Sequence, residues 1–137
     1  LHLSIRRQRQ MCIRDRKKYY HKASFLNKLV GVGGVLYPAN SLDGEVVNSE
    51  LFNRLAPTND DIWFWFMAIK AGTRINVVKG NHPKPVDAYG SQSTIKLTDI
   101  NDNGDMLFWS QFNNLISYYP EIRNALISEM KQNYVRG

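Results

Sequence analysis

The chain has 137 residues, enough for one domain with a buried core, and its 43% hydrophobic and 12% aromatic content excludes wholesale disorder. The formal net charge of +6 is concentrated at one end. Residues 1–18 hold seven Lys and Arg against one Asp, whereas from residue 19 onward 11 basic residues balance 11 acidic ones. The part expected to fold therefore has no basic field of its own, which argues against a nucleic-acid partner.

We expect the basic leader at 1–18 to stand apart from a folded region at 19–137. Within the leader, the hexapeptide MCIRDR at 11–16 resembles the translation of a transposon adaptor used to build sequencing libraries. The leader is thus either non-native read-through or a disordered basic arm. The single cysteine, Cys12, lies inside it, so we expect neither a disulfide nor a cysteine-based metal site. The longest wholly apolar run, Ile62 to Ile69, is far shorter than the ~18 residues of a membrane helix.

Strand and helix signals alternate through the first part of the folded region. Phe25 to Tyr37, which is apolar and β-branched with three glycines, predicts a buried strand. A turn rich in Pro, Asn, Ser, Asp and Gly follows at 38–44, and Ser49 to Leu55 predicts a short helical turn. The strongest helix signal covers 60–70, and Arg74 to Lys79 predicts the next strand.

The second part is expected to end in two helices. Residues 80–93 are rich in Gly, Pro, Ser and Asn and predict a surface loop. Helices are predicted at Leu107 to Tyr118 and at Glu121 to Asn133, with Pro120 suited to a helix start. Strands, a central helix and terminal helices together predict an α/β fold.

Two acids open the helix predicted at 60–70. Thr58 or Asn59 is the expected N-cap, and Asp60 and Asp61 follow in the first turn. Free N–H groups and the helix dipole stabilise a charged carboxylate there, so it persists in the form that accepts a proton. The alternative is that both acids only cap a buried helix.

The segments GVGGVLYPANSL and LAPTNDDIWFWFMAIKAG, with the later NDNGDMLFW and YYPEI, resemble the second half of inverting glycosyltransferases of the GT-A type. The family 2-like enzymes of bacterial surface polysaccharide synthesis are the most similar, and the resemblance covers about 22–122. It implies the C-terminal part of a Rossmann-like GT-A domain, with a few strands, a buried aromatic helix and two terminal helices. It also implies Asp61 as the catalytic base and Asp60 as its orienting neighbour.

The same resemblance implies a nucleotide-sugar donor, a glycan acceptor and Mg²⁺ or Mn²⁺ in the complete enzyme, located in the cytoplasm or at the inner face of the membrane. This sequence departs from the family because it contains no DxD, the acidic motif that would hold the metal; Asp43-Gly44-Glu45 is the nearest imitation. The chain is therefore expected to be a fragment that is inactive alone. His82 would be a late metal ligand in such enzymes, or else an exposed loop histidine.

The glycines offer further candidates for substrate contact. Gly31, Gly33 and Gly34 fail the dinucleotide pattern because Leu36 stands where a third small residue belongs. Either these glycines allow close packing, or Gly33 and Gly34 let a sugar approach the backbone.

Of the two tryptophans in the aromatic helix, Trp65 lies four residues after Asp61 and shares its helix face, whereas Trp63 points elsewhere. Trp65 is therefore the ring expected to touch the acceptor, with core packing as the alternative for both rings.

The sequence leaves two rival functions open. A non-enzymatic carbohydrate-binding module would use the aromatic residues without needing an acid, and a nucleic-acid binder would depend wholly on 1–18. The transferase interpretation depends on one expectation, that the Asp61 carboxylate faces an open sugar cleft.

Overall fold

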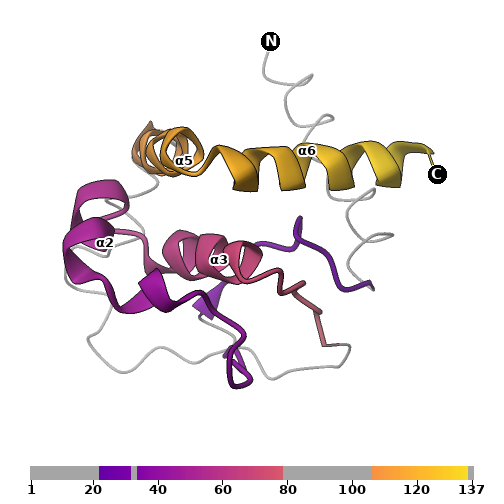
Figure 1. The fold of residues 1–137 in the computed structure, drawn as a ribbon, viewed down its shortest axis with the longest axis horizontal. Helices are drawn as coiled ribbons and strands as arrows, with labels where there is room; N and C mark the ends of the chain where they lie inside the picture. The colour runs from indigo at the N-terminus through magenta and orange to yellow at the C-terminus, as the bar shows by residue number, and fades with distance from the viewer. Residues whose placement is uncertain (1–21, 32–33, 79–105, 136–137) are drawn as a thin grey trace, which may run out of the picture.

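The computed structural model describes residues 22–31, 34–78 and 106–135. Within these residues the chain forms a 3-10 helix, η2 (Gly44–Val47), and the α-helices α2 (Ser49–Leu55), α3 (Asp60–Lys70), α5 (Met106–Tyr118) and α6 (Pro120–Val135). Helix α3 contacts η2 and α6, and α5 contacts α2 and α6. Figure 1 shows α5 and α6 on one side of α3, with the segment 34–43 on the opposite side.

The predicted α/β fold, and with it the Rossmann-like GT-A domain, is wrong for this part of the chain. No strand occurs in the described ranges, which are helical apart from extended segments and turns. Among the described residues, one isolated antiparallel bridge joins Ile75, in the second expected strand, to Ser24, the residue before the first expected strand. Loop 80–93, and Lys79 at the end of the second expected strand, lie outside the described residues.

The first expected strand does not form because its backbone N–H groups donate to side chains and to a nearby turn carbonyl. They do not pair with the backbone of a neighbouring strand. The Phe25 N–H donates to Glu129 of α6 at 3.2 Å, and the Leu26 N–H donates to the Ser24 hydroxyl. Further along, the Gly34 N–H donates to the Gly31 carbonyl, and Gly34 takes a φ of 84°, outside the range of a strand. The apolar pattern therefore marks burial here rather than sheet pairing.

The helices follow their predicted positions closely. The predicted turn at 49–55 is α2, capped by the Asn48 side chain, which accepts from the Leu51 N–H. Helix α3 starts where the acids predicted, and α6 begins at Pro120. These boundaries could be predicted because caps and apolar periodicity are local signals.

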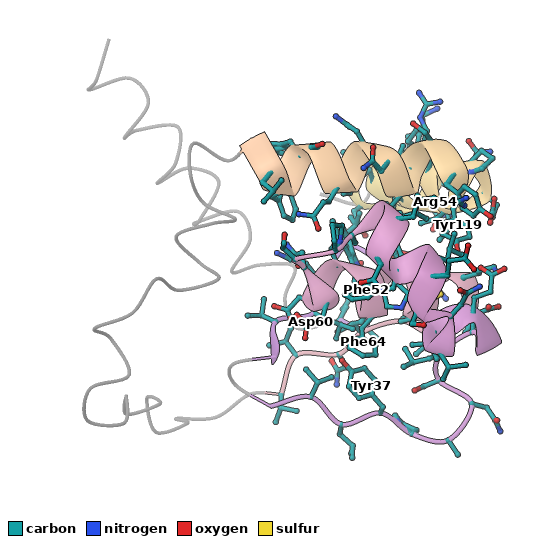
Figure 2. All side chains as sticks on the ribbon, turned by 90° about the vertical axis from the view of Figure 1, so that its left-hand side faces the viewer. Tyr37, Phe52, Arg54, Asp60, Phe64 and Tyr119 are labelled. Atoms are coloured by element: carbon teal, nitrogen blue, oxygen red, sulfur yellow. The ribbon has the colours of Figure 1, made fainter. Side chains whose placement is uncertain are left out.

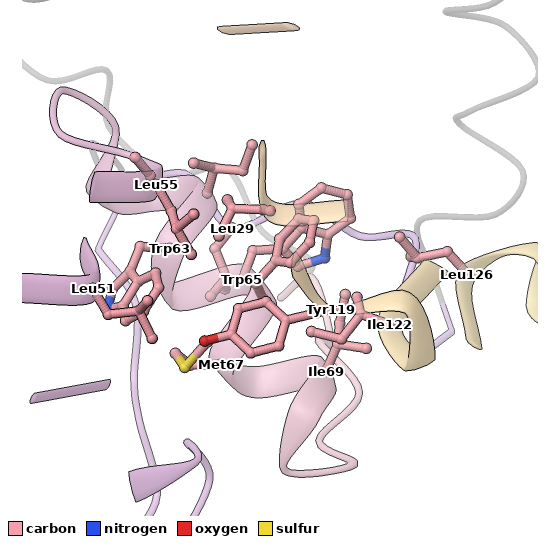
Figure 3. Packing of buried hydrophobic residues seen from close by; sticks show 14 residues of the cluster. Leu29, Leu51, Leu55, Trp63, Trp65, Met67, Ile69, Tyr119, Ile122 and Leu126 are labelled. Carbon is pink, nitrogen blue, oxygen red and sulfur yellow. The ribbon is translucent and has the colours of Figure 1, made fainter. Parts of the chain in front are cut away.

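Helix α3 forms the centre of the hydrophobic core. Its buried residues lie on nearly every side of the helix, as expected of an apolar helix covered all round, and they are Ile62, Trp63, Trp65, Phe66, Met67, Ala68 and Ile69. Figure 3 shows Tyr119, Ile122 and Leu126 packed against them. Both tryptophans bond through their ring N–H: Trp63 to the Val46 carbonyl and Trp65 to the Phe25 carbonyl.

A buried glutamine links α5 to the entry of α3. The Gln111 side chain is 2% exposed, and its amide nitrogen donates to the Thr58 hydroxyl at 2.9 Å while its oxygen accepts from the Thr58 N–H at 3.2 Å. The nitrogen and the oxygen of this side-chain amide both form hydrogen bonds with Thr58. Helix α5 therefore fixes the turn that leads into the acid pair.

Helix α3 ends in a motif that requires glycine. The Thr73 N–H donates to the Ala68 carbonyl and the Gly72 N–H to the Ile69 carbonyl, the bond pattern of a Schellman cap, and Gly72 has a φ of 75°.

Gly72→Ala is therefore expected to lower the free energy of unfolding by about 1 kcal/mol, because a side chain strains this left-handed backbone. Gly44→Ala is the matched control, since an added Cβ there meets nothing within 4 Å and its φ is not in the left-handed range. Urea unfolding of both variants measures the difference, and equal stabilities would contradict the assignment.

Candidate functional site

The acid pair lies at the N-terminus of α3, as predicted. Asn59 is the N-cap, and its side-chain oxygen accepts from the Ile62 N–H at 3.1 Å. Because Asn59 fills the capping role, neither acid is needed for it. Asp60 is exposed, and its Oδ1 accepts from the Asp61 N–H at 3.1 Å.

Asp61 is held by a contact that spans 30 residues. Its Oδ1 accepts from the Gly31 N–H at 2.8 Å, and a Cβ placed on Gly31 would stand 3.1 Å from the same oxygen. The Asp61 residue is partly exposed, so it is neither sealed in the interior nor turned wholly to solvent. A carboxylate fixed by a backbone donor at a helix N-terminus is suited to accept a proton from a bound hydroxyl.

An aromatic pair stands beside the acids. The rings of Tyr37 and Phe64 lie 5.6 Å apart and tilted, and Tyr37 is 40% exposed. Burial, and then the negative charges of Asp61 and Asp60, raise the pKa of the Tyr37 hydroxyl, which therefore stays protonated and able to donate. Figure 2 shows Tyr37, Phe64 and Asp60 on the side of the molecule away from α5 and α6.

A cavity of about 920 Å³ opens next to this group. Its walls come from the segments 28–30, 34–38, 41–42 and 73–78, with Ala68 from α3, and they are mostly apolar. Tyr37 lines it, as does Val30, the residue before Gly31, but Asp61 does not. Asp61 therefore does not face this cavity, and the expectation that its carboxylate faces an open cleft is not met there.

The remaining predicted contacts divide into three cases. Gly34 lines the cavity, and a Cβ there would meet nothing within 4 Å, although its φ favours glycine. Gly33 and His82 lie outside the described residues. Trp65 is 8% exposed, bonded to Phe25 and stacked on Phe112, so its ring packs in the core, the alternative that the sequence left open.

The Asp43-Gly44-Glu45 segment does not fit a metal. Lys70 of α3 bonds to Asp43 at 3.2 Å and to Glu45 at 2.8 Å, while the Tyr119 hydroxyl donates to Glu45 at 2.6 Å. The lysine amine thus supplies the positive charge that a bound cation would bring. Across the described ranges, no group of three His, Cys, Asp or Glu side chains could hold a metal ion.

This cluster makes stability depend on pH. The Glu45 N–H and then Lys70 lower the pKa of Asp43, and bonds from Lys70 and then Tyr119 lower the pKa of Glu45. Burial alone would lower the pKa of Lys70, but its bonds to Glu45 and Asp43 outweigh burial and raise it.

A carboxylate with a lowered pKa stabilises the fold above its unfolded pKa of about 4, and that stabilisation is lost as pH falls through the folded pKa. A lysine with a raised pKa stabilises the fold below its unfolded pKa of about 10.4, and that stabilisation is lost as pH rises through the folded pKa.

Lys70→Met is therefore expected to lower the free energy of unfolding near pH 7 by about 0.5–1 kcal/mol, a range that reflects the partial exposure of all three side chains. The deficit should shrink at pH 3, because that pH is below the unfolded pKa of both carboxylates and part of the stabilisation that they give is already lost there. Urea unfolding at the two pH values measures it, with the exposed Lys131→Met as control. A deficit that persists undiminished at pH 3 would show that the ion pairs are not its source.

The sequence pattern did not single out Tyr37 or the bond from Gly31. The only sequence feature of Tyr37 was its position at the end of an expected strand, and the Gly31 contact joins two segments far apart in sequence.

Across residues 22–31, 34–78 and 106–135, none of the helices has both the length and the apolar character that a membrane span requires. Comparisons with protein-family models, curated proteins and solved structures found no match to this chain.

Proposed function

We propose that this protein takes part in inverting transfer of a sugar from a nucleotide-sugar donor to a glycan hydroxyl, with Asp61 as the general base. The observation that carries the proposal is the state of the Asp61 carboxylate. It is partly exposed, fixed by the Gly31 N–H at 2.8 Å and not used as the helix cap. Asn59 fills the N-cap position, so N-capping does not account for the Asp61 carboxylate.

In the proposed reaction, the acceptor hydroxyl gives its proton to Asp61 while its oxygen attacks the anomeric carbon of the donor. The new glycosidic bond forms on the face opposite the nucleoside diphosphate, which leaves with the electrons of the broken C–O bond. A base of this kind typically contributes ~10²–10⁴-fold in rate. The rest of the rate enhancement would come from positioning and from stabilising the charge on the leaving diphosphate.

Two neighbours support this role for Asp61. Asp60 accepts the N–H of Asp61 at 3.1 Å and adds a second negative charge at the same helix end. The Tyr37 hydroxyl, kept protonated by its raised pKa, is a donor for a sugar oxygen at the rim of the cavity. An aromatic ring next to hydroxyl-bonding groups is a common way to bind a sugar, because the ring covers the C–H face while the polar groups take the hydroxyls.

The leaving diphosphate needs positive charge, and the resemblance implies that Mg²⁺ or Mn²⁺ supplies it. Asp43 and Glu45 do not fit that metal, because Lys70 already pairs with both. Asp43 and Glu45 are therefore not expected to hold a metal for the leaving diphosphate.

The test is an assay of sugar transfer by the complete product of the gene that encodes this chain, with and without the substitution Asp61→Asn. Release of nucleoside diphosphate from UDP-, GDP- and dTDP-sugars reports transfer in the presence of a glycan acceptor. Turnover by the Asp61→Asn variant equal to that of the unaltered protein would refute the proposed base. No nucleotide release from any of the donors would count against the transferase itself.

The half-exposed ring of Tyr37 favours a second candidate, a carbohydrate-binding module. Such a module would bind glycan without nucleotide, would lose binding on Tyr37→Ala and would be indifferent to Asp61→Asn. Isothermal titration of a soluble glycan into the two variants without nucleotide, together with the transfer assay on both, separates the candidates, because only a transferase shows turnover that depends on Asp61.

A further inference from the structure

We propose that Gly31 is a positioning residue for the Asp61 base: its backbone N–H aims the carboxylate, and its lack of a side chain makes that aim possible. The inference rests on the proposed function for its catalytic consequence but on geometry alone for the contact. The N–H to Oδ1 distance is 2.8 Å, well inside hydrogen-bonding range.

A bond to one carboxylate oxygen sets the direction of the other. Rotation about the last side-chain torsion of an aspartate is broad, so a free carboxylate samples many orientations. Holding Oδ1 against a backbone donor removes that freedom and fixes where Oδ2 points. A base must lie within about 2.6–3.2 Å of the hydroxyl whose proton it takes, so this orientation bears directly on the rate.

Both partners of the bond are anchored independently. Asp61 belongs to α3, and the next residue, Ile62, is fully buried in the core. On the other side, Leu29 is 6% exposed and holds the approaching chain, while the Gly31 carbonyl accepts from the Gly34 N–H at 2.9 Å. The bond thus joins an exposed position to a partly exposed one, and each is next to a residue or segment anchored in the core.

The requirement for glycine at 31 is steric. A Cβ at this position would lie 3.1 Å from Oδ1 of Asp61, closer than an ordinary van der Waals contact, so the carboxylate or the backbone must shift by a few tenths of an ångström. Gly34 differs, since its φ of 84° and not its surroundings demands glycine. Gly44 has neither requirement and is the matched control.

The contact can be tested without any substrate by ¹H–¹⁵N NMR of the full chain. A hydrogen bond to a carboxylate moves an amide proton resonance downfield, so Asp61→Ala should shift the Gly31 amide upfield, whereas Asp60→Ala should leave it nearly unchanged. Gly31→Ala should shift the Asp61 side-chain carboxyl carbon resonance, and Gly44→Ala should not. A Gly31 amide proton resonance that does not move in the Asp61→Ala variant would overturn the inference.

The catalytic consequence is tested in the transfer assay. Misplacement of a reacting group by about 1 Å can cost ~10²-fold, and the shift expected here is a few tenths of an ångström. Gly31→Ala is therefore expected to lower kcat by about 3- to 10-fold while KM and thermal stability stay close to those of the unaltered protein. Gly44→Ala should change neither constant. In an Asp61→Asn background, Gly31→Ala should cause no further loss of kcat, because its effect acts only through the base.

The outcomes separate this inference from the proposed function. If Asp61→Asn keeps full turnover, the proposed base is wrong, although the NMR contact can still be present. If Asp61→Asn loses turnover and Gly31→Ala keeps it, the positioning role is wrong and the base stands. A loss in Gly31→Ala that adds to the loss in Asp61→Asn would also overturn the positioning role.

Discussion

Replacing Asp61 by asparagine is expected to slow sugar transfer by about 10²–10⁴-fold, the contribution typical of a general base. Asparagine keeps the shape of the side chain and an oxygen that can accept from the Gly31 N–H, but it cannot take a proton. The loss should therefore fall on kcat rather than on KM. Initial rates of nucleotide release, measured over a range of acceptor concentrations, separate the two constants.

The matched control for this prediction is Asp60→Asn. It removes the same charge from the same end of α3, at an exposed side chain whose Oδ1 accepts the Asp61 N–H. We expect it to cost less than about tenfold, since asparagine can keep this bond and the base remains. Equal losses in the two variants would indicate that negative charge at the helix end matters, and not proton acceptance by Asp61. Far-UV circular dichroism confirms that both variants are folded.

Replacing Phe66 by alanine is expected to lower the free energy of unfolding by about 3–5 kcal/mol. Phe66 is fully buried, and its ring meets those of Trp65 and Phe112 edge to face, with centroids 5.7 Å away in each case. Alanine removes the ring and leaves a void that its packed neighbours can fill only in part. Against a total stability of about 5–15 kcal/mol, this loss would bring the chain close to unfolding at room temperature.

Urea unfolding followed by tryptophan fluorescence measures the effect, with Val47→Ala as the control. Val47 is 85% exposed, so its substitution should change stability by less than about 0.5 kcal/mol. A Phe66→Ala variant as stable as Val47→Ala would mean that the ring is not part of a close-packed core.

Helix positions could be predicted because their signals are local. Asn59, Asp60 and Asp61 mark the start of α3 within three residues, and Gly72 marks its end. Strand prediction failed for the opposite reason, since a strand exists only where a partner takes up its backbone groups. At Phe25 those groups go to side chains of α3 and α6, which no pattern within 25–37 could reveal.

The candidate site could likewise be predicted only where its signals are local in sequence. The position of Asp61 at a helix start followed from its neighbours in sequence, but its bond to Gly31 depends on how a segment 30 residues earlier packs on α3. The four-residue spacing places Trp65 on the same helix face as Asp61, but it does not indicate what covers that face. The segment carrying Phe25 covers it, and Tyr37 is the exposed ring instead.

The two bonds at Phe25 have a consequence for how the molecule opens. Its carbonyl accepts from the Trp65 ring N–H of α3, and its N–H donates to the Glu129 carboxylate of α6. The same carboxylate lies 3.5 Å from the Nε atom of Arg74, which follows the C-terminal end of α3. The segment 22–31 therefore cannot detach without breaking contacts to both helices, and α6 cannot lift away without exposing the Phe25 amide. Hydrogen exchange at that amide should follow the cooperative opening of α6 rather than the fraying of a loose chain end.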